Sequence, residues 1–318
     1  MKAAVVTRFD RPPRYQEFPA PVPAGPHEVC VDVVAAALSP RVRSQASGSH
    51  YTSTEQLPLI PGIDGVGRTS DGELRYFLLP DTTYGSMAEQ TVIDVRRSVL
   101  LPSDADPVRM AAAINPAMSS WVALRSRIAF RPGQSVLVLG ATGSAGRVAV
   151  QVAKHLGASR VVAVGRGMEL MSDLMSLGAD ALVELAGDHD VMASALAAAG
   201  RDVDVVLDYL WGEPTADALR AIVPHRADDA QSLTWVQIGS VAGPDSLIPS
   251  AALRAVALQI VGSGQGSVDA GDIRDEIATL AKELVKGSFA LATRAVPLAD
   301  VETTWADTDA TERLVVVP

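Results

Sequence analysis

The stretch SVLVLGATGSAGRVAVQVAKHLGA, residues 135–158, decides the fold class of this chain. A short apolar segment, typical of a buried strand, runs directly into an amphipathic helix. The turn between them holds the pattern Ala-x-Gly-x-x-Gly, formed by Ala141, Gly143 and Gly146. Glycines at the last two positions let the backbone approach a pyrophosphate and let the helix pack closely on the strand. Free amide groups at a helix N-terminus also favour a phosphate. The stretch therefore predicts a dinucleotide-binding turn.

Strand-like and helix-like segments alternate downstream of this turn. The strand-like segments are 160–164, 181–185, 202–210, 234–240 and 257–263, and the helix-like ones are 168–178, 190–200 and 215–223. Continuous apolar strands separated by helices indicate a parallel sheet that is covered on both faces. Together with 135–139, the strand count predicts a six-stranded doubly wound (Rossmann) sheet.

The end of the second strand distinguishes between NAD and NADP. An acidic side chain about 20 residues beyond the glycine turn would bind the ribose 2′-hydroxyl of NAD. Gly165 and Arg166 stand at that point instead, and the nearest acid, Glu169, belongs to the next helix. Because arginine pairs well with phosphate, the sequence predicts NADPH; the alternative is a merely solvated Arg166. The predicted cofactor-binding residues in this region are Ala141, Thr142, Gly143, Ser144, Ala145, Gly146, Gly165 and Arg166.

The first third of the chain has β character. Residues 2–7 and 28–37 are rich in β-branched side chains, and 85–94 ends in a similar run. Proline and glycine clusters bound these segments, which predicts a small barrel or sandwich. Helical spacing follows over 106–130, where the proline of Asn115-Pro116 is expected to end or kink the helix.

The C-terminal segment returns to mixed signals. Residues 269–289 have an acidic start and a Lys-Gly end, as a helix would, and 298–306 predicts a second, short helix. The final run, 313–318, reads as a strand. We expect this segment to rejoin the N-terminal β region.

Composition excludes several classes of function. The net charge of −10 disfavours binding to nucleic acid, whose phosphates would repel the chain. Cys30 is the single cysteine, which excludes a disulfide framework and a zinc site built on several thiolates. No apolar run is long enough to span a membrane, and no signal peptide is apparent. The composition predicts a soluble, cytoplasmic protein.

Several motifs together resemble the medium-chain dehydrogenase/reductase superfamily, in its zinc-free quinone oxidoreductase branch. They are GPHEVCVDVVAAAL (25–38), PGIDGVG (61–67), YGSMAEQTVID (84–94), the nucleotide turn and RLVVVP (313–318). The resemblance covers nearly the whole chain. It implies a GroES-like β-barrel catalytic domain (1–122 and 267–318) and a Rossmann NADP-binding domain (123–266). It also implies a homodimer formed through the edge strand 257–263.

The resemblance further implies chemistry without a metal. Zinc-dependent relatives carry Gly-His-Glu where this chain has Gly62, Ile63 and Asp64, and isoleucine cannot bind zinc. An earlier cysteine ligand of those relatives corresponds to the region of Ser39. The four-cysteine structural zinc lobe is missing as well. Asp64 is expected to make a structural hydrogen bond to nearby loop amides.

Catalytic and pocket residues are also expected from the family plan. Tyr51 is a candidate proton donor, with His50 as its competitor and Ser39 as a further polar group; for both Tyr51 and His50 the alternative is a structural or surface position. Asn115, Tyr209 and Trp211 are expected in the substrate pocket, although Asn115 is equally suited to capping a helix. The ends of the last two strands are expected beside the nicotinamide, at Ile238, Gly239, Ser240, Ser263 and Gly264.

Three functions fit these features. The first is an NADPH-dependent oxidoreductase that transfers hydride to a quinone or another conjugated carbonyl. The second is an enoyl-thioester reductase, with Arg41 or Arg43 at the mouth of a groove for the thioester arm. The third is a non-catalytic NADPH-binding sensor or structural protein. The intact nucleotide turn favours an enzyme.

Overall fold

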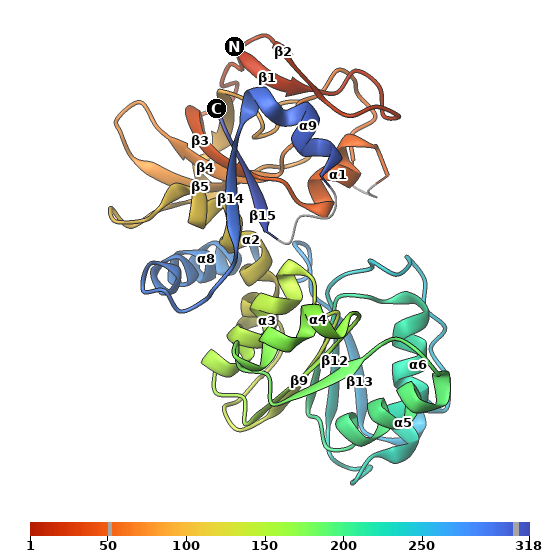
Figure 1. The fold of residues 1–318 in the computed structure, drawn as a ribbon. Helices are drawn as coiled ribbons and strands as arrows, with labels where there is room; N and C mark the ends of the chain where they lie inside the picture. Colours follow the sequence, from red (N-terminus) through yellow and green to blue (C-terminus); the bar gives the residue numbers. More distant parts are fainter. Residues whose placement is uncertain (50–52, 308–311) are drawn as a thin grey trace. The chain divides into compact units, whose positions relative to one another are not determined.

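The computed structural model describes residues 1–49, 53–307 and 312–318. Its internal contacts divide the chain into two units. Unit 1 comprises Met1–Asn115 and Arg274–Pro318, and unit 2 comprises Pro116–Ile273 (Figure 1). Each unit has its own sheet and its own buried apolar core.

Unit 2 is built on a six-stranded sheet. Its strands are β8 (Ser135–Leu139), β9 (Arg160–Gly165), β10 (Ala181–Glu184), β11 (Val205–Asp208), β12 (Leu233–Gln237) and β13 (Leu258–Gly262). Their order is β10-β9-β8-β11-β12-β13, and every neighbouring pair is parallel. The predicted doubly wound sheet is confirmed. The strand order reverses between β8 and β11, the place where such sheets bind dinucleotides.

Helices cover both faces of this sheet. They are α3 (Ser144–His155), α4 (Met168–Met171), α5 (His189–Gly200), α6 (Gly212–Ile222) and α7 (Ala252–Ala255), with 3-10 turns over Ser172–Met175 and Val223–His225. In Figure 1, α3 and α4 lie on one side of the strands and α5 and α6 on the other, as right-handed crossovers require. The amphipathic α3 buries its apolar face through Val148, Ala149 and Val152.

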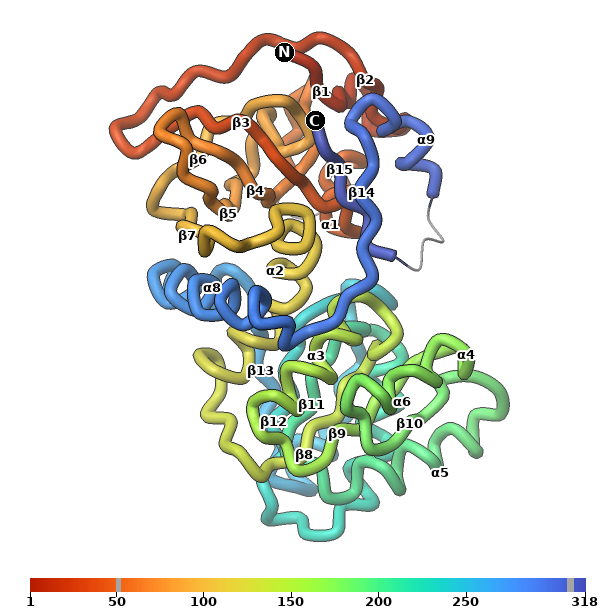
Figure 2. The backbone as a smooth tube through the Cα atoms, turned by 60° about the vertical axis from the view of Figure 1, so that its left-hand side comes forward, coloured from red at the N-terminus to blue at the C-terminus, as the bar shows by residue number. Residues whose placement is uncertain are grey.

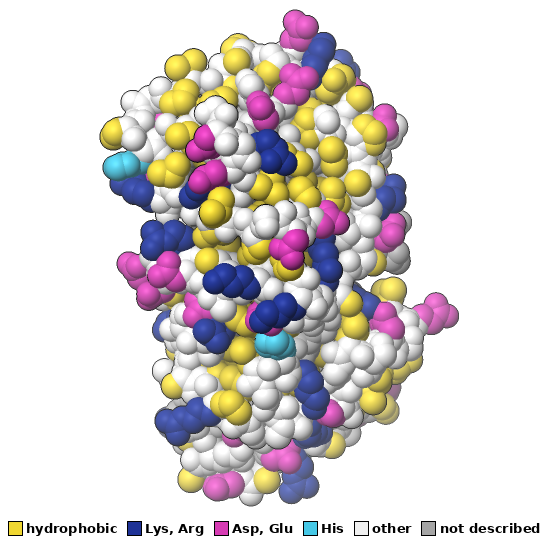
Figure 3. Space-filling model, turned by 90° about the vertical axis from the view of Figure 1, so that its left-hand side faces the viewer, with side chains coloured by type: hydrophobic (Ala, Val, Ile, Leu, Met, Phe, Trp, Pro, Cys, Tyr) yellow, Lys and Arg dark blue, Asp and Glu magenta, His cyan; other side chains and the backbone are white. Residues whose placement is uncertain are grey.

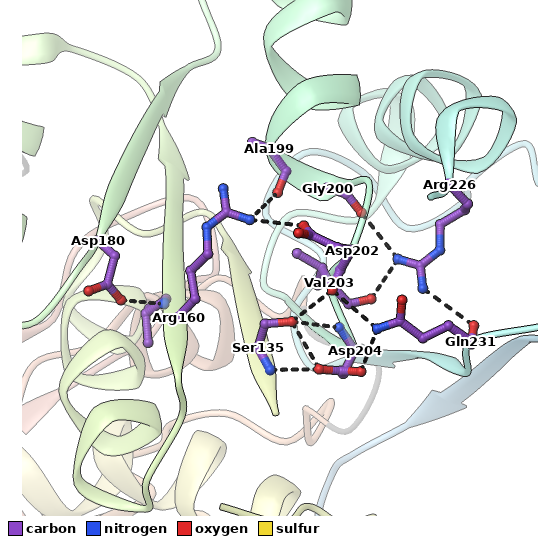
Figure 4. Close-up of polar contacts among 11 residues, drawn as sticks. Ser135, Arg160, Asp180, Ala199, Gly200, Asp202, Val203, Asp204, Arg226 and Gln231 are labelled. Atoms are coloured by element: carbon purple, nitrogen blue, oxygen red, sulfur yellow. Dashed lines mark hydrogen bonds and ion pairs between the residues drawn. The ribbon is translucent and has the colours of Figure 1, made fainter. Parts of the chain in front are cut away.

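A polar network closes the amino-terminal end of this sheet (Figure 4). The Asp204 carboxylate accepts hydrogen bonds from the backbone amide of Ser135 (2.7 Å) and from the Gln231 side chain (2.8 Å). The buried Arg226 guanidinium donates to the carbonyl groups of Gly200 and Val203. The network therefore joins the starts of β8 and β11 to the loops beside them, at the edge opposite the glycine turn.

Unit 1 has a mixed sheet. Its strands are β1 (Lys2–Val5), β2 (Arg14–Glu17), β3 (Glu28–Ala37), β4 (Asp64–Arg68), β5 (Leu74–Leu78), β6 (Gln90–Asp94), β7 (Ser98–Leu100), β14 (Thr293–Pro297) and β15 (Arg313–Val317). The main sheet runs β14-β15-β3-β4-β5-β7, β6 pairs with β3, and β1 pairs with β2. The C-terminal β15 lies antiparallel to β3, so the predicted return of the tail to the N-terminal region is confirmed (Figure 2).

The stretch PGIDGVG is more regular than expected. The three glycines of residues 61–67 and the match of this stretch to a loop of the superfamily predict a loop with a tight backbone path, but the structure places Asp64–Arg68 in strand β4. Gly67 lets β4 lie close to β3, since a Cβ at that position would approach Val31 Cγ2 to 2.7 Å. Only Gly62, with φ of 122°, keeps the conformation of a turn. Contacts between strands distant in sequence override the local turn signal of three glycines.

The remaining helices include a correction. They are α1 (Pro40–Ala46), α2 (Pro107–Val122), α8 (Ala270–Val285) and α9 (Val301–Ala306), with short 3-10 turns over Val95–Arg97 and Leu298–Asp300. We expected the helix to end or kink at Asn115-Pro116. It does not end there: α2 continues through Pro116 to Val122 and passes into a π-helical segment, Ala123–Arg127. A proline inside a helix has a local cost in free energy, and the packing of the surrounding helix can outweigh this cost.

The surface carries both signs of charge. Figure 3 shows Lys and Arg side chains interspersed with Asp and Glu over the face in view. Among the described residues, no helix combines the length and the apolar character that crossing a bilayer would need.

Candidate functional site

Two glycines of the nucleotide turn have different constraints. A Cβ on Gly146 would lie 2.2 Å from the carbonyl oxygen of Gly140 and 2.7 Å from Ala141 Cα, so α3 can pack on β8 only with glycine there. A Cβ on Gly143 would meet nothing closer than 3.8 Å, and the backbone of Gly143 has a φ of −73°. The protein's own packing therefore does not require Gly143. The glycine leaves space for a molecule that approaches the turn from outside.

The start of α3 is suited to an anion. The helix begins at Ser144, its N-cap is Gly143, and no side chain caps it or places a negative charge in its first turn. The first hydrogen bond of the helix runs from the Arg147 amide to the carbonyl oxygen of Gly143. The amides of Ser144, Ala145 and Gly146 therefore have no partner within the helix. A pyrophosphate could accept hydrogen bonds from this turn. Thr142 lies beside it, within 2.8 Å of where a Cβ of Gly165 would be.

A cavity of about 460 Å³ lies in unit 2 at the carboxyl ends of its strands. Its lining residues are Arg166, Leu185, Met192, Leu196, Leu210, Glu213, Pro214, Asp217, Val241 and Ala242. Arg166 is exposed, and within the described part of the chain its guanidinium makes no hydrogen bond or ion pair. The leucines and Met192 offer an apolar wall for a base. The apolar wall and the available cation fit an adenosine that carries a 2′-phosphate.

Sequence reasoning missed Asp208, the last residue of β11. Its carboxylate is fully buried and accepts four hydrogen bonds. Two come from the backbone amides of Leu210 and Trp211, both at 2.9 Å. The others come from the Thr215 hydroxyl at 2.6 Å and Trp235 Nε1 at 2.8 Å. Asp208 thus shapes the turn after β11. An acid directly after an apolar strand, in VVLD, was the signal available in the sequence.

The two aromatic residues of that turn have different environments. Trp211 is half-buried and has a φ of 56°, the one positive value of a non-glycine residue in the described part of the chain. Such a backbone costs about 1–3 kcal/mol and often marks a functional segment. Tyr209 is buried, and its hydroxyl lies 2.9 Å from Ser119 Oγ. Burial raises the pKa of Tyr209 to about 12, so it stays protonated at neutral pH.

Four of the five predicted nicotinamide-side residues already use their backbone amides. Ile238 and Gly239 both donate to the carbonyl oxygen of Asp208, at 2.8 and 3.1 Å. The amide of Ser263 donates to Gln237, and that of Gly264 donates to Ser267. The groups at these positions that remain for a ligand are carbonyl oxygens, the Ser240 amide and the Ser240 and Ser263 side chains. Whether they contact a cofactor stays a prediction.

In unit 1, the predicted catalytic residues are only partly described. His50 and Tyr51 lie outside the described residues. Ser39 is buried and caps α1, where its hydroxyl accepts a hydrogen bond from the Val42 amide at 3.1 Å. Arg41 pairs with Asp81 at 3.3 Å. Arg43 donates to the carbonyl oxygens of Trp305 and Asp307 and lies over the Trp305 ring, so it is held within unit 1.

Asp64 is the centre of a buried polar group in unit 1. Its carboxylate accepts a hydrogen bond from the Tyr76 hydroxyl at 2.6 Å. The Asn115 side chain lies near the same carboxylate and helps to lower its pKa. Arg313 is 7% exposed and its charge acts on the same carboxylate. These partners are side chains of β5, α2 and β15, and not the loop amides that we expected. Tyr76 and Arg313 were not singled out by sequence reasoning.

No group of three or more His, Cys, Asp and Glu side chains suited to a metal ion lies within residues 1–49, 53–307 and 312–318. The polar clusters in unit 1 and at the strand ends of unit 2 are instead hydrogen-bond networks. What the strand ends of unit 2 can hold is a dinucleotide, with its pyrophosphate at the glycine turn and its adenosine in the cavity.

Comparisons with known proteins agree with this geometry. The family model described as zinc-binding dehydrogenase matches residues 145–285. A probable NADPH-dependent quinone reductase, tdiC, of Emericella nidulans is 31% identical, with the whole of both chains covered. The quinone oxidoreductase of Thermus thermophilus, solved alone and with NADPH, is 25% identical and has a TM-score of 0.77, again over both whole chains. A mycobacterial quinone oxidoreductase has the same fold, with a TM-score of 0.85 at 20% identity over both whole chains.

Proposed function

Because the chain belongs to the medium-chain dehydrogenase/reductase superfamily, in its quinone oxidoreductase-like branch, we propose that it is an NADPH-dependent enzyme that reduces quinones or conjugated carbonyl compounds. The observation that carries the proposal is the pairing of an unobstructed Gly143 with the available Arg166 guanidinium. The full-length relative from Emericella nidulans is described as a probable NADPH-dependent quinone reductase, which supports the same activity.

The chain's own residues have defined tasks in this proposal. The turn at Gly143 and the first amides of α3 bind the pyrophosphate, and Arg166 binds the 2′-phosphate. When bound, NADPH supplies a hydride from its nicotinamide ring. A conjugated acceptor suits this transfer because it spreads the incoming charge over several atoms. Tyr51 or His50 donates the proton that completes the reduction.

The predicted pocket residues remain part of the proposal. Asn115, Tyr209 and Trp211 remain proposed substrate-pocket residues, and Ser39 a proposed polar group of the catalytic domain. The Tyr209 hydroxyl is buried and hydrogen-bonded to Ser119, and burial raises its pKa to about 12. These properties favour a structural role for Tyr209 over proton transfer. We propose residues 123–266 as the NADP-binding domain and the remainder as the catalytic domain.

The decisive test is an NADPH-oxidation screen with quinones, enones, enals and enoyl-CoA thioesters, run in parallel with NADH. We expect turnover of quinones or enones with NADPH. Arg166→Ala should raise the KM for NADPH about 10- to 100-fold, as expected for a lost charge-assisted hydrogen bond, and leave the KM for NADH unchanged. Arg201→Ala, an exposed arginine of the same unit, is the matched control.

Two outcomes would overturn the proposal. Turnover of crotonyl-CoA without any quinone or enone activity would favour an enoyl-thioester reductase. The engagement of Arg43 with carbonyl groups of α9 and its neighbour speaks against that alternative. NADPH binding without oxidation by any acceptor would favour a sensor or structural role.

We further propose a homodimer formed through β13. This strand is at the edge of its sheet, and its residues Leu258, Ile260 and Val261 are only partly buried within the chain. An apolar edge strand needs cover, and a symmetric copy of the same strand would provide it.

A further inference from the structure

Arg166 lies in a short turn between β9 and α4, with a glycine on each side. Gly165 ends the strand, and a Cβ at this position would lie 2.8 Å from Thr142 Cγ2. Gly167 has a φ of 79°, a conformation that favours glycine. Because glycines restrain the chain little, the position of Arg166 depends on what else holds this turn.

Glu184 holds the turn from the neighbouring strand. It is the last residue of β10 and lies opposite Gly165 in the parallel β9–β10 pair. Its Oε1 atom accepts a hydrogen bond from the Met168 amide at 3.1 Å. The amide of the next residue, Leu185, donates to the Gly165 carbonyl oxygen at 2.6 Å. The end of β10 therefore binds the chain on both sides of Arg166.

The helix after the turn is anchored by other contacts. Met171 of α4 and Leu174 in the 3-10 turn that follows are fully buried. From α3, the Arg147 guanidinium donates to the Asp173 carboxylate at 3.0 Å. Loss of the Glu184 hydrogen bond should therefore loosen the turn without detaching the helix.

The Glu184 carboxylate does not pair with Arg166, although the two residues belong to neighbouring strand ends. In the described part of the chain, the Arg166 guanidinium makes no hydrogen bond or ion pair. Arg166 and Leu185 both line the cavity at the carboxyl ends of the strands. The acid thus contacts the backbone of the turn and leaves the cation available to a ligand.

We propose that Glu184 is a positioning residue for the 2′-phosphate of NADPH: it holds the Met168 amide and thereby fixes the turn that presents Arg166 to the cavity. The inference rests on the proposed function, in which Arg166 binds this phosphate. An arginine on a restrained turn loses less conformational freedom when it binds, so the same charge pair gives a higher affinity. Glu184 then adds a residue of a third strand to those that set the cofactor preference.

Two fragments of the cofactor test this inference directly. Adenosine 2′,5′-bisphosphate and 5′-AMP differ only in the 2′-phosphate, so the ratio of their Kd values measures recognition of that group. Calorimetry on the full chain should show tighter binding of the bisphosphate. In Glu184→Ala we expect this ratio to fall about three- to tenfold, the usual effect of one lost hydrogen bond, with the Kd of 5′-AMP unchanged.

The sign of this change separates positioning from simple electrostatics. Removal of an acid near a phosphate would by itself strengthen phosphate binding, whereas loss of the hold on the turn weakens it. Glu184→Gln keeps an acceptor oxygen and should therefore retain at least the wild-type ratio. Glu184→Asp keeps the charge on a shorter side chain and should lower the ratio as Glu184→Ala does. This second variant also keeps the test decisive if Glu184→Ala does not fold.

Glu169→Ala is the matched control, because it removes an exposed acid from the first turn of α4. It should not lower the ratio. An unchanged or raised ratio in Glu184→Ala would overturn the inference. Equal weakening of both fragments would also overturn it, since Glu184 would then support the ribose or the cavity in general.

Hydrogen exchange measures the hold on the turn without any ligand. The Met168 amide should exchange about threefold or more faster in Glu184→Ala than in the wild type, because its acceptor is gone. Equal exchange rates would contradict the proposed hold.

The fragments also distinguish this inference from the proposed function. A wild-type ratio near one would refute the role of Arg166, and the inference with it. A high wild-type ratio that Glu184→Ala leaves unchanged would refute the inference alone. In Arg166→Ala the ratio should already be low, and Glu184→Ala should lower it no further. Because no acceptor is needed, a failure to find a substrate would leave these results unaffected.

Discussion

Two glycines three residues apart in the nucleotide turn show how a single position serves either packing or binding. Gly146 is required because any Cβ would overlap the Gly140 carbonyl oxygen. Gly143 has free space around it, so the reason for a glycine there lies outside the chain. The sequence pattern predicted both positions, but only the structure separates their roles.

This separation predicts opposite effects of two alanine substitutions. Gly146→Ala should lower the free energy of unfolding by about 1–3 kcal/mol, the usual cost of overpacking. Gly143→Ala should leave thermal stability unchanged and weaken NADPH binding about tenfold, because the added methyl group occupies the approach of the pyrophosphate. Thermal melts without ligand and fluorescence titrations with NADPH measure the two effects. Unaltered NADPH affinity in Gly143→Ala would contradict this assignment.

The buried Asp64 predicts an effect on stability that depends on pH. Its pKa of about 6 in the folded chain exceeds the ordinary value of 3.8, so folding favours the protonated form. The resulting contribution to stability is fully present below about pH 4 and is lost as the pH rises through 6. The expected loss is about 3 kcal/mol. Urea unfolding of the wild type and Asp64→Ala should give free-energy differences that change by most of this amount between about pH 4.5 and 7.5. A pH-independent difference would refute the expectation.

At the level of elements, the two ends of the unit 2 strands have different tasks. At the carboxyl ends, Asp208 orders the turn after β11 and the cavity with Arg166 opens beside it. At the amino ends, Asp204 and Arg226 connect strand starts to loops (Figure 4). The polar network at the amino ends stabilises the sheet, and we expect the carboxyl ends to bind the ligand.

The amino-end network should therefore affect stability and not binding. Arg226→Met removes the guanidinium donor of the Val203 carbonyl group and one of the two donors of the Gly200 carbonyl group, which also accepts from the Val203 amide. We expect a loss of about 2–4 kcal/mol in the free energy of unfolding, with NADPH affinity unchanged. Arg201→Met, an exposed arginine at the end of α5, should change neither quantity. A large fall in NADPH affinity of folded Arg226→Met would argue against this division of tasks.

At the scale of the whole molecule, two units with separate cores are interleaved in the sequence. Unit 1 contains both the start and the end of the chain, and the C-terminal strand β15 pairs with β3. Unit 2 has an open sheet whose edge strand β13 is only partly covered. The proposed dimer depends on this edge, because two copies of the chain would associate through β13.

Adding charge to the β13 edge should disrupt the proposed dimer. Gln259→Lys combined with Val261→Lys would bring like charges together when two copies of the strand pair. We expect the wild type to sediment as a dimer at micromolar concentration and the double variant as a monomer. Val191→Lys, which charges an exposed position on α5, is the control. A wild-type protein that is monomeric under the same conditions would contradict the proposed dimer.

Much of unit 2 could be predicted from sequence because its signals are local. Apolar strands alternate with amphipathic helices, and each signal lies within about 15 neighbouring residues. Unit 1 was less predictable. Strand β4 was mistaken for a loop because its three glycines suggested a turn, although its partners, β3 and β5, determine its conformation. For the same kind of reason, the helix does not end at Pro116.

The sequence by itself determined the doubly wound sheet, the dinucleotide turn and the preference for NADPH. These follow from periodicity and from residue types at fixed spacing, which short segments of chain already contain. Only the tertiary structure decided the partners of Asp64, which come from positions 76, 115 and 313 on three different elements. No local pattern links such positions, because their contact depends on strand register and on the return of the C-terminus to β3. The physical reason is that a buried charge is stabilised by whatever folding brings beside it.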